Sequence, residues 1–313
     1  MTKIISYSLF KQTGPKFDRN SHDPLDNKQD RYWLNIPFIL LANKYIFKDI
    51  TTKLYLSSNL KNHRLFPLLA KAAQNLDSFE LAIVNRPVVG TEPTLWRMMP
   101  LWEKDIEFCF CRDLDSVVTA YEAKIMSYFM GTSFLINNIR TLAFHNGEGT
   151  SLMAGLSGYN VTRLKEELPL PKGFDNYMRF YKKSINKSTW GCDQETLINF
   201  FIRHRPERIR RKILDIYVQP SPSVKQELKG TVNPNKHYNV VSSDINIVKN
   251  NKLIGTNNKI IQFIDSQSTW AGGPINASGA PLRQLINFIN DDYCNKMKDI
   301  ITSNKTLLNF YKI

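Results

Sequence analysis

The sequence has few cysteines and no long apolar run, and both shortages exclude classes of protein. Four cysteines in 313 residues, none in a CxxC pair, argue against a cysteine zinc site and are too few for a disulfide framework. No stretch approaches the roughly 20 apolar residues of a membrane-spanning helix, since the apolar run 36–42 is soon followed by Lys44. The first eleven residues lack a signal-peptide cleavage pattern and predict a strand. We therefore expect reduced thiols, no membrane span and a cytoplasmic location, in the host cytoplasm if the protein is viral.

Acidic residues are also scarce relative to basic ones. The chain has 42 Lys and Arg against 28 Asp and Glu, a formal net charge of +14. Such an excess favours a polyanionic partner, for example a nucleic acid. An AT-rich genome gives a similar Lys- and Asn-rich composition, so part of the excess need not reflect a partner.

The 42% hydrophobic content can bury a large core, and the first half of the chain alternates strand-like and helix-like segments. The predicted strands are 3–9, 53–58, 79–85 and 106–111, and the predicted helices are 32–47, 65–76 and 94–103. Uninterrupted apolar strands are typical of a parallel sheet covered by helices on both faces. We predict an α/β fold, Rossmann-type, with a mostly parallel sheet flanked by helices.

The second half is less regular and is predicted to form an irregular region of the same single domain, 1–313. Predicted strands are 133–138, 212–218 and 259–265, predicted helices are 175–185, 194–204 and one from Ser278, and 151–160 is a small-residue turn region. The segment 219–258 is rich in Pro, Ser, Asn and Lys, which predicts a long loop.

The stretch FCFCRDLDSV, residues 108–117, joins an apolar strand to two closely spaced carboxylates. Thr119 and Glu122 then form a capping-box pattern that predicts a helix running to about Met130, with Gly131 as its stop signal. In an extended segment Asp113 and Asp115 project to the same side and can share one hard cation such as Mg²⁺ or Mn²⁺. Asp is also common in turns after strands, and a D-x-D triplet arises readily by chance.

Three segments resemble one known family. LWRMMPLWEKDIEFCFCRDLDSVVTAYEAKIMSYFM (95–130) resembles the segment around the D-x-D motif of GT-A-type glycosyltransferases of bacteria, phages and large viruses. AFHNGEGTSLMAGLSGYN (143–160) and WGCDQETLINFF (190–201) are similar to later elements of that family. The chain departs from the family pattern at Ala154, where a glycine is expected, and in lacking a clear metal-binding histidine after residue 201.

The resemblance implies a GT-A-like fold and transfer of a sugar from a nucleotide-sugar donor, with Mn²⁺ or Mg²⁺ held by Asp113 and Asp115. Residues 1–131 would then bind the nucleotide sugar, and 132–313 would form the acceptor side, with a basic insertion around 203–258. Arg97 and Arg112 would meet the diphosphate or order the loop, although an arginine beside acids is often a structural ion pair. Ser116 would contact the nucleotide or cap the following helix, and capping is the more common role.

On the acceptor side, Asp193 and Gln194 match an Asp-Gln pair of the family. Asp193 would be the catalytic base of an inverting enzyme, or alternatively a helix N-cap. His145 is a candidate substrate or metal contact. Gly272 and Gly273 are candidates for a loop that closely approaches a sugar, or for an ordinary turn.

A basic segment follows the Asp-Gln pair and is a candidate nucleic-acid-binding surface. Its residues are Arg203, Arg205, Arg208, Arg210, Arg211 and Lys212. Such a surface suits an acceptor that is a hydroxymethylated base in viral DNA, extruded from the stack. A solvated helix face explains the same charges. The competing functions are transfer to a glycan or another non-DNA acceptor, a metal-dependent nuclease and a non-catalytic DNA-binding protein.

Overall fold

A single seven-stranded sheet runs through the protein. The computed structural model describes residues 1–11, 30–47, 49–88, 90–141, 152–184, 192–203, 205–218 and 279–311, together with residues 260, 263, 264 and 267. The strands are β1 (Thr2–Leu9), β2 (Thr51–Ser57), β3 (Phe79–Val84), β4 (Ile106–Arg112), β5 (Ile136–Thr141), β6 (Leu156–Asn160) and β7 (Ile213–Val218). Their spatial order is β3-β2-β1-β4-β6-β5-β7. All neighbours are parallel except β6, which is antiparallel to β4 and β5. The predicted α/β fold with a mostly parallel sheet is confirmed.

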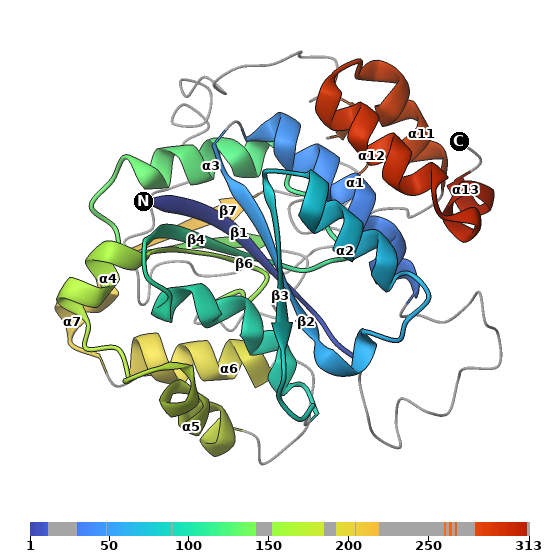
Figure 1. Ribbon diagram of the computed structural model, residues 1–313. Helices are drawn as coiled ribbons and strands as arrows, with labels where there is room; N and C mark the ends of the chain where they lie inside the picture. Colours follow the sequence, from blue (N-terminus) through green and yellow to red (C-terminus); the bar gives the residue numbers. More distant parts are fainter. Residues whose placement is uncertain are drawn as a thin grey trace, which may run out of the picture.

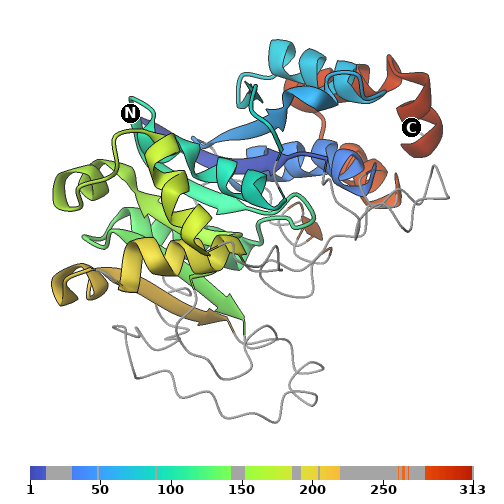
Figure 2. The same ribbon diagram turned by 90° about the horizontal axis from the view of Figure 1, so that it is seen from below.

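Helices cover both faces of this sheet. One face carries α1 (Asp30–Ile46), α2 (Phe66–Asn75), α3 (Ala120–Met130), α11 (Gly279–Phe288), α12 (Asp292–Thr302) and α13 (Lys305–Tyr311). The other carries the 3-10 helix η3 (Glu92–Trp102), α4 (Val161–Glu167), α5 (Phe174–Ser184), α6 (Cys192–Ile198), the π-helical turn η5 (Asn199–Arg203) and α7 (Glu207–Arg210). Figure 1 shows the C-terminal helices beside α1 and α2, and Figure 2 shows α6 on the opposite side of the sheet.

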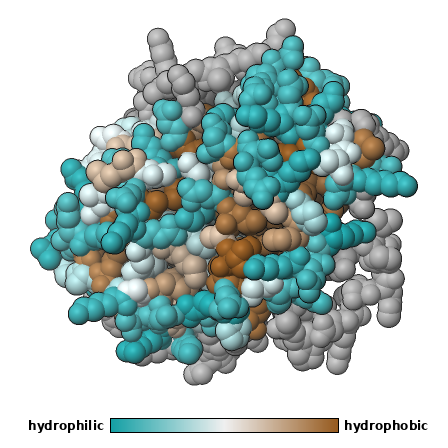
Figure 3. Space-filling model, in the orientation of Figure 1, coloured by the Kyte–Doolittle hydropathy of each residue, from teal (hydrophilic) through white to brown (hydrophobic). Residues whose placement is uncertain are grey.

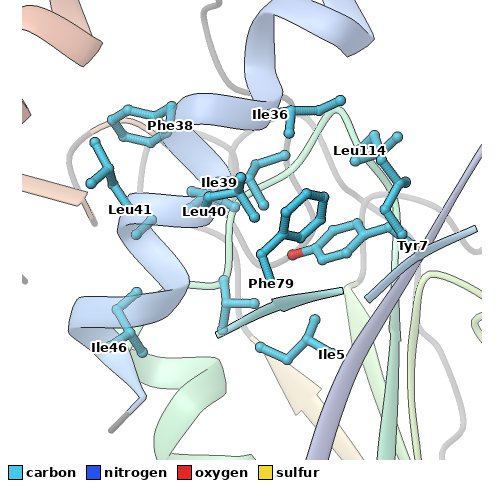
Figure 4. Packing of buried hydrophobic residues seen from close by; sticks show 14 of the residues in the cluster. Ile5, Tyr7, Ile36, Phe38, Ile39, Leu40, Leu41, Ile46, Phe79 and Leu114 are labelled. Atoms are coloured by element: carbon cyan, nitrogen blue, oxygen red, sulfur yellow. The ribbon is translucent and has the colours of Figure 1, made fainter. Parts of the chain in front are cut away.

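The buried strands explain this three-layer arrangement. In β1, Ile5 and Tyr7 belong to the apolar cluster under α1, while Ile4 belongs to the cluster under η3. Successive side chains of a strand point to opposite faces, so a strand that is apolar at consecutive positions needs cover on both. Figure 4 shows Ile36 and Ile39 of α1 packed towards Ile5 and Tyr7.

The two cysteines of β4 occupy the core as small apolar side chains. Cys109 and Cys111 are buried free thiols, and the Sγ of Cys111 lies 3.3 Å from the carbonyl oxygen of Arg97. Burial raises the pKa of the Cys109 thiol well above its usual range. The expected reduced, structural role of these cysteines is consistent with their positions.

Strand β6 occupies the second half of the turn region predicted over 151–160, whereas residues 154 and 155 do form a turn. Its five residues are all buried, and Gly158 pairs with Phe110 across the antiparallel ladder. A Cβ on Gly158 would lie 2.6 Å from Cδ1 of Phe110, so the aromatic ring occupies the space of a side chain. The glycine that suggested a turn is therefore required by close packing inside the sheet.

Replacing Gly158 with Ala tests this packing. We expect Gly158→Ala to lower the free energy of unfolding by about 1–3 kcal/mol, because the ring of Phe110 must move to admit the methyl group. Gly131→Ala is the matched control, since its Cβ would meet the carbonyl oxygen of Tyr128 at an ordinary 3.5 Å. Denaturant unfolding of both variants measures the difference. Equal unfolding midpoints would show that the Phe110 contact does not constrain β6.

The prediction of a strand over 259–265 is wrong at the residues that the structure describes. Ile260, Phe263 and Ile264 are helical. Ile260 and Ile264 are both buried in the cluster under α1, and Phe263 packs against that cluster. The spacing of these three side chains, i, i+3 and i+4, matches the period of a helix and was obscured by the short apolar run.

Strand β3 forms one edge of the sheet. Its Leu81 and Ala82 are half-buried, and Ile83 is among the exposed large apolar residues. Figure 3 shows an apolar patch near the middle of the face on which Figure 1 places β3. Glu80, which is exposed on the same strand, adds the charge that edge strands commonly carry. Within the described part of the chain, no helix combines the length and the apolar character needed to cross a membrane.

Candidate functional site

The D-x-D motif forms a tight turn at the carboxyl end of β4. The backbone N–H and the hydroxyl of Ser116 both donate to the carbonyl oxygen of Asp113, at 3.2 and 3.1 Å. Leu114 is buried, whereas the side chain of Asp113 is 53% exposed and Asp115 is half-buried. The motif is thus a turn and not the extended segment that we expected. Buried Leu114 anchors the turn in the core. The turn lies at the carboxyl edge of the parallel strands, which is where open α/β sheets bind ligands.

The helix after the turn begins as predicted. Thr119 is the N-cap of α3, and its hydroxyl and the carboxylate of Glu122 form a reciprocal capping box. Gly131 follows as the C-cap. Because Thr119 caps this helix, Ser116 does not. The hydroxyl of Ser116 closes the D-x-D turn instead.

Arg112 points into the protein. Its guanidinium pairs with Glu122 at 2.5 Å, and both side chains are completely buried. It also donates to the carbonyl oxygens of Val117 and Gly155, at 3.3 and 3.4 Å. These contacts support the structural ion pair, the alternative to a donor-binding role. The pair ties β4 to α3 on either side of the D-x-D turn.

Arg97 joins two carboxylates that lie far apart in the sequence. This nearly buried residue of η3 pairs with Asp113 through Nη1 and with Asp193 through Nη2, the latter at 2.6 Å. Burial opposes the charge on the guanidinium, yet the carboxylates of Asp113 and Asp193 raise the pKa of Arg97 above its ordinary value. The predicted donor-side acid Asp113 and the predicted acceptor-side acid Asp193 therefore share the guanidinium of Arg97.

Neighbouring segments complete the site. The second carboxylate oxygen of Asp193 accepts from the backbone N–H of Gln194 at 2.9 Å, and the amide of Gln194 lies 3.8 Å from the sulfur of Met153. A Cβ on Gly155 would lie only 1.9 Å from Oδ2 of Asp113, so glycine is the residue that allows this carboxylate to lie against β6. We did not single out Gly155 from the sequence. The small-residue segment before β6 was the available signal.

Several predicted site residues lie outside the described residues. They are His145, Gly272 and Gly273, together with most of the basic insertion and the side chain of Arg203.

The described basic residues mostly have local partners. The guanidinium of Arg205 donates to the carbonyl oxygen of Phe200 at 2.7 Å and lies over its ring. Arg211 pairs with Glu207, and Lys212 pairs with Glu167. Arg208 is exposed and Arg210 is half-buried. The positive surface formed by the described residues is therefore smaller than the sequence indicated.

Asp113 and Asp115 offer the carboxylate oxygens that a hard divalent cation prefers, although the extended geometry expected to turn both to one side is replaced by a turn. Mg²⁺ typically takes one or two carboxylates and completes its shell with phosphate and water. Among the described residues there is no group of three His, Cys, Asp or Glu side chains placed to hold a metal. A cation at this turn would therefore depend on oxygens supplied by substrate and water.

These observations define an α/β protein whose polar residues converge at the carboxyl edge of β4. No protein-family model matches the chain, and a search of curated proteins finds no match. Among solved structures, it is similar to the crystal structure of residues 1–349 of S. aureus TarS, with 9% sequence identity and a TM-score of 0.37. The match covers 100% of this chain and 73% of that one.

Proposed function

We propose that the protein is a glycosyltransferase that moves a sugar from a nucleotide-sugar donor to an acceptor hydroxyl. The observation that carries the proposal is the contact of Arg97 with both Asp113 and Asp193. These residues lie in segments that separately resemble glycosyltransferases, and their side chains meet at one point. Their meeting at the carboxyl edge of the sheet, where open α/β sheets bind ligands, supports the proposal.

In this proposal Asp113 and Asp115 hold Mn²⁺ or Mg²⁺. The cation would stabilise the negative charge that develops on the departing diphosphate. Arg97 balances the charge of Asp113 before the donor arrives and keeps this carboxylate oriented. Gly155 leaves room for that orientation.

Asp193 remains the candidate base. Its carboxylate is mostly buried and accepts hydrogen bonds from Arg97 and from the N–H of Gln194. These contacts fix its direction, as a base requires, and each carboxylate oxygen keeps a second lone pair that can accept the proton of the acceptor hydroxyl.

The test is a panel of nucleotide sugars with Mn²⁺, scored for release of nucleoside diphosphate, with and without hydroxymethylated DNA. Release that depends on donor identity and increases with acceptor supports transfer. Cleavage of DNA without nucleotide release would favour a nuclease. DNA binding with neither reaction would favour a non-catalytic binding protein.

A hydroxymethylated DNA base is the proposed acceptor because of the basic segment around α7. We expect duplex DNA binding that weakens steeply with salt, because phosphate contacts release counterions. Each phosphate contact that a variant loses should reduce the magnitude of the slope of log affinity against log salt by about one. Replacing Arg208, Arg210 and Arg211 with Ala should reduce both the affinity and this slope. Electrophoretic mobility shifts at several salt concentrations measure the effect.

The control removes equal charge from elsewhere on the surface. Lys61, Lys298 and Lys305 are exposed, and their replacement with Ala should leave DNA binding close to that of the unmodified protein. Equal loss in the two triple variants would mean that net charge, and not the α7 segment, drives binding. No binding at low salt would favour a glycan or a small-molecule acceptor.

A further inference from the structure

We infer that Asn35 of α1 is a positioning residue for the D-x-D turn. Its side-chain amide donates to the carbonyl oxygen of Leu114 at 3.1 Å, across 79 positions of sequence. Leu114 is the residue between Asp113 and Asp115, so this bond holds the peptide that joins the two carboxylates. The inference deepens the proposed function, on which its metal-binding consequence rests.

The surroundings of Asn35 indicate that this bond has a purpose beyond packing. Asn35 is 1% exposed, and its Oδ1 has no hydrogen-bond partner within the described part of the chain. Burying an amide that is only half satisfied costs free energy that an apolar residue of similar size would avoid. What the amide supplies in return is a fixed donor aimed at the turn.

Helix α1 also holds the side chain of Leu114. Leu114 belongs to the same buried cluster as Ile36 and Tyr7, and Figure 4 shows it beside both. The middle residue of the motif is therefore fixed twice, by its side chain in the core and by its carbonyl oxygen on Asn35. Of the two flanking aspartates, Asp113 has a side chain that is 53% exposed, and Asp115 is half-buried.

Arg97 and Asn35 restrain different parts of the turn. Arg97 contacts the carboxylate of Asp113, whereas Asn35 contacts the backbone one residue later. A metal that binds Asp113 must compete with the guanidinium of Arg97, but it does not disturb the bond to Asn35. The restraint from α1 thus persists when the carboxylates are in use, which is what a supporting residue must do.

The same helix provides a matched control. Asn43 lies about two turns further along α1 and is equally buried, at 1% exposure. It donates to the hydroxyls of Tyr7 and Thr52, at 3.1 and 2.9 Å, and its Oδ1 also lacks a partner among the described residues. Asn35→Leu and Asn43→Leu make the same chemical change in the same helix, and the bond removed with Asn35 is the one to the D-x-D turn.

The first measurement is amide hydrogen exchange, which needs no activity. The backbone N–H of Ser116 reports on the turn because it donates to the carbonyl oxygen of Asp113. We expect its exchange to be about tenfold faster in Asn35→Leu, the size of one lost buried hydrogen bond, and unchanged in Asn43→Leu. Equal exchange in the two variants overturns the inference.

The second measurement is Mn²⁺ affinity, by titration with the metal alone followed by electron paramagnetic resonance. We expect the Kd of Asn35→Leu to rise by about 10- to 100-fold, as for other residues that support metal ligands, while Asn43→Leu stays near the unmodified value. If either Leu variant fails to fold, the pair Asn35→Ala and Asn43→Ala replaces it. Faster exchange at Ser116 in a protein that binds no Mn²⁺ at all would uphold the positioning role and refute the metal site of the proposed function.

Discussion

Asp113→Asn is expected to reduce kcat/KM for sugar transfer by about 10³-fold, the loss typical when a group that stabilises transition-state charge is removed. Asparagine keeps the shape of the side chain but loses its negative charge. The proposed cation would then lose a ligand that faces the open edge of the sheet. The fold should survive, because the side chain of Asp113 is half exposed and Arg97 retains its pair with Asp193.

Steady-state rates with Mn²⁺ and a productive donor measure this loss. Asp77→Asn is the matched control, since Asp77 is 83% exposed and its contact with Lys44 is a surface ion pair at 3.6 Å. Its kcat/KM should equal that of the unmodified protein. Full activity of Asp113→Asn in chelator-treated buffer would refute the metal role of the D-x-D turn.

Arg112→Met is expected to lower the free energy of unfolding by about 3–5 kcal/mol, because it leaves the carboxylate of Glu122 buried without its cation. Both side chains are completely buried, so water cannot replace the lost partner. Denaturant unfolding followed by circular dichroism gives the change. The double variant Arg112→Met with Glu122→Leu should lose less than the single variant, since no unpaired charge remains in the core.

Arg211→Met provides the contrast. Its pair with Glu207 is exposed on both sides, and removing such a pair changes stability by about 0.5 kcal/mol or less. If Arg112→Met unfolds like the unmodified protein but loses affinity for a nucleotide sugar, the guanidinium belongs to the donor site and not to the core.

The first four strands and the helices between them were predictable because their apolar runs are long and their boundaries carry clear signals. The capping box at Thr119 placed the start of α3 correctly. Strand β6 was not predictable in this way. Its Gly158 is required because the ring of Phe110 fills the space of a side chain there, and only the folded sheet brings Phe110, 48 positions earlier, close to Gly158. Local propensity cannot express such a requirement.

In the site, too, some residues were predictable from local sequence and others were not. Asp113, Asp115 and Asp193 stood out as acids at a strand end and in a family-like motif, and the structure places Asp113 and Asp193 on one guanidinium. Arg112 looked like a donor contact because it adjoins the motif, yet successive residues of a strand point to opposite faces. Asn35 carried a weaker signal, a polar residue inside an apolar helix, whose meaning depends on the partner that α1 meets.

Strand β6 also bears on how the protein reaches its native state. Because it runs opposite to β4, its first residues lie at the same edge as the D-x-D turn, and Leu156 pairs with Arg112. The polar cluster therefore assembles from η3, the end of β4, the start of β6 and α6, segments separated by up to about a hundred positions. Contacts of such high sequence separation close slowly. Refolding chains should regain helix content first and ligand-binding competence last, which leaves a nascent chain incompetent until α6 has emerged from the ribosome.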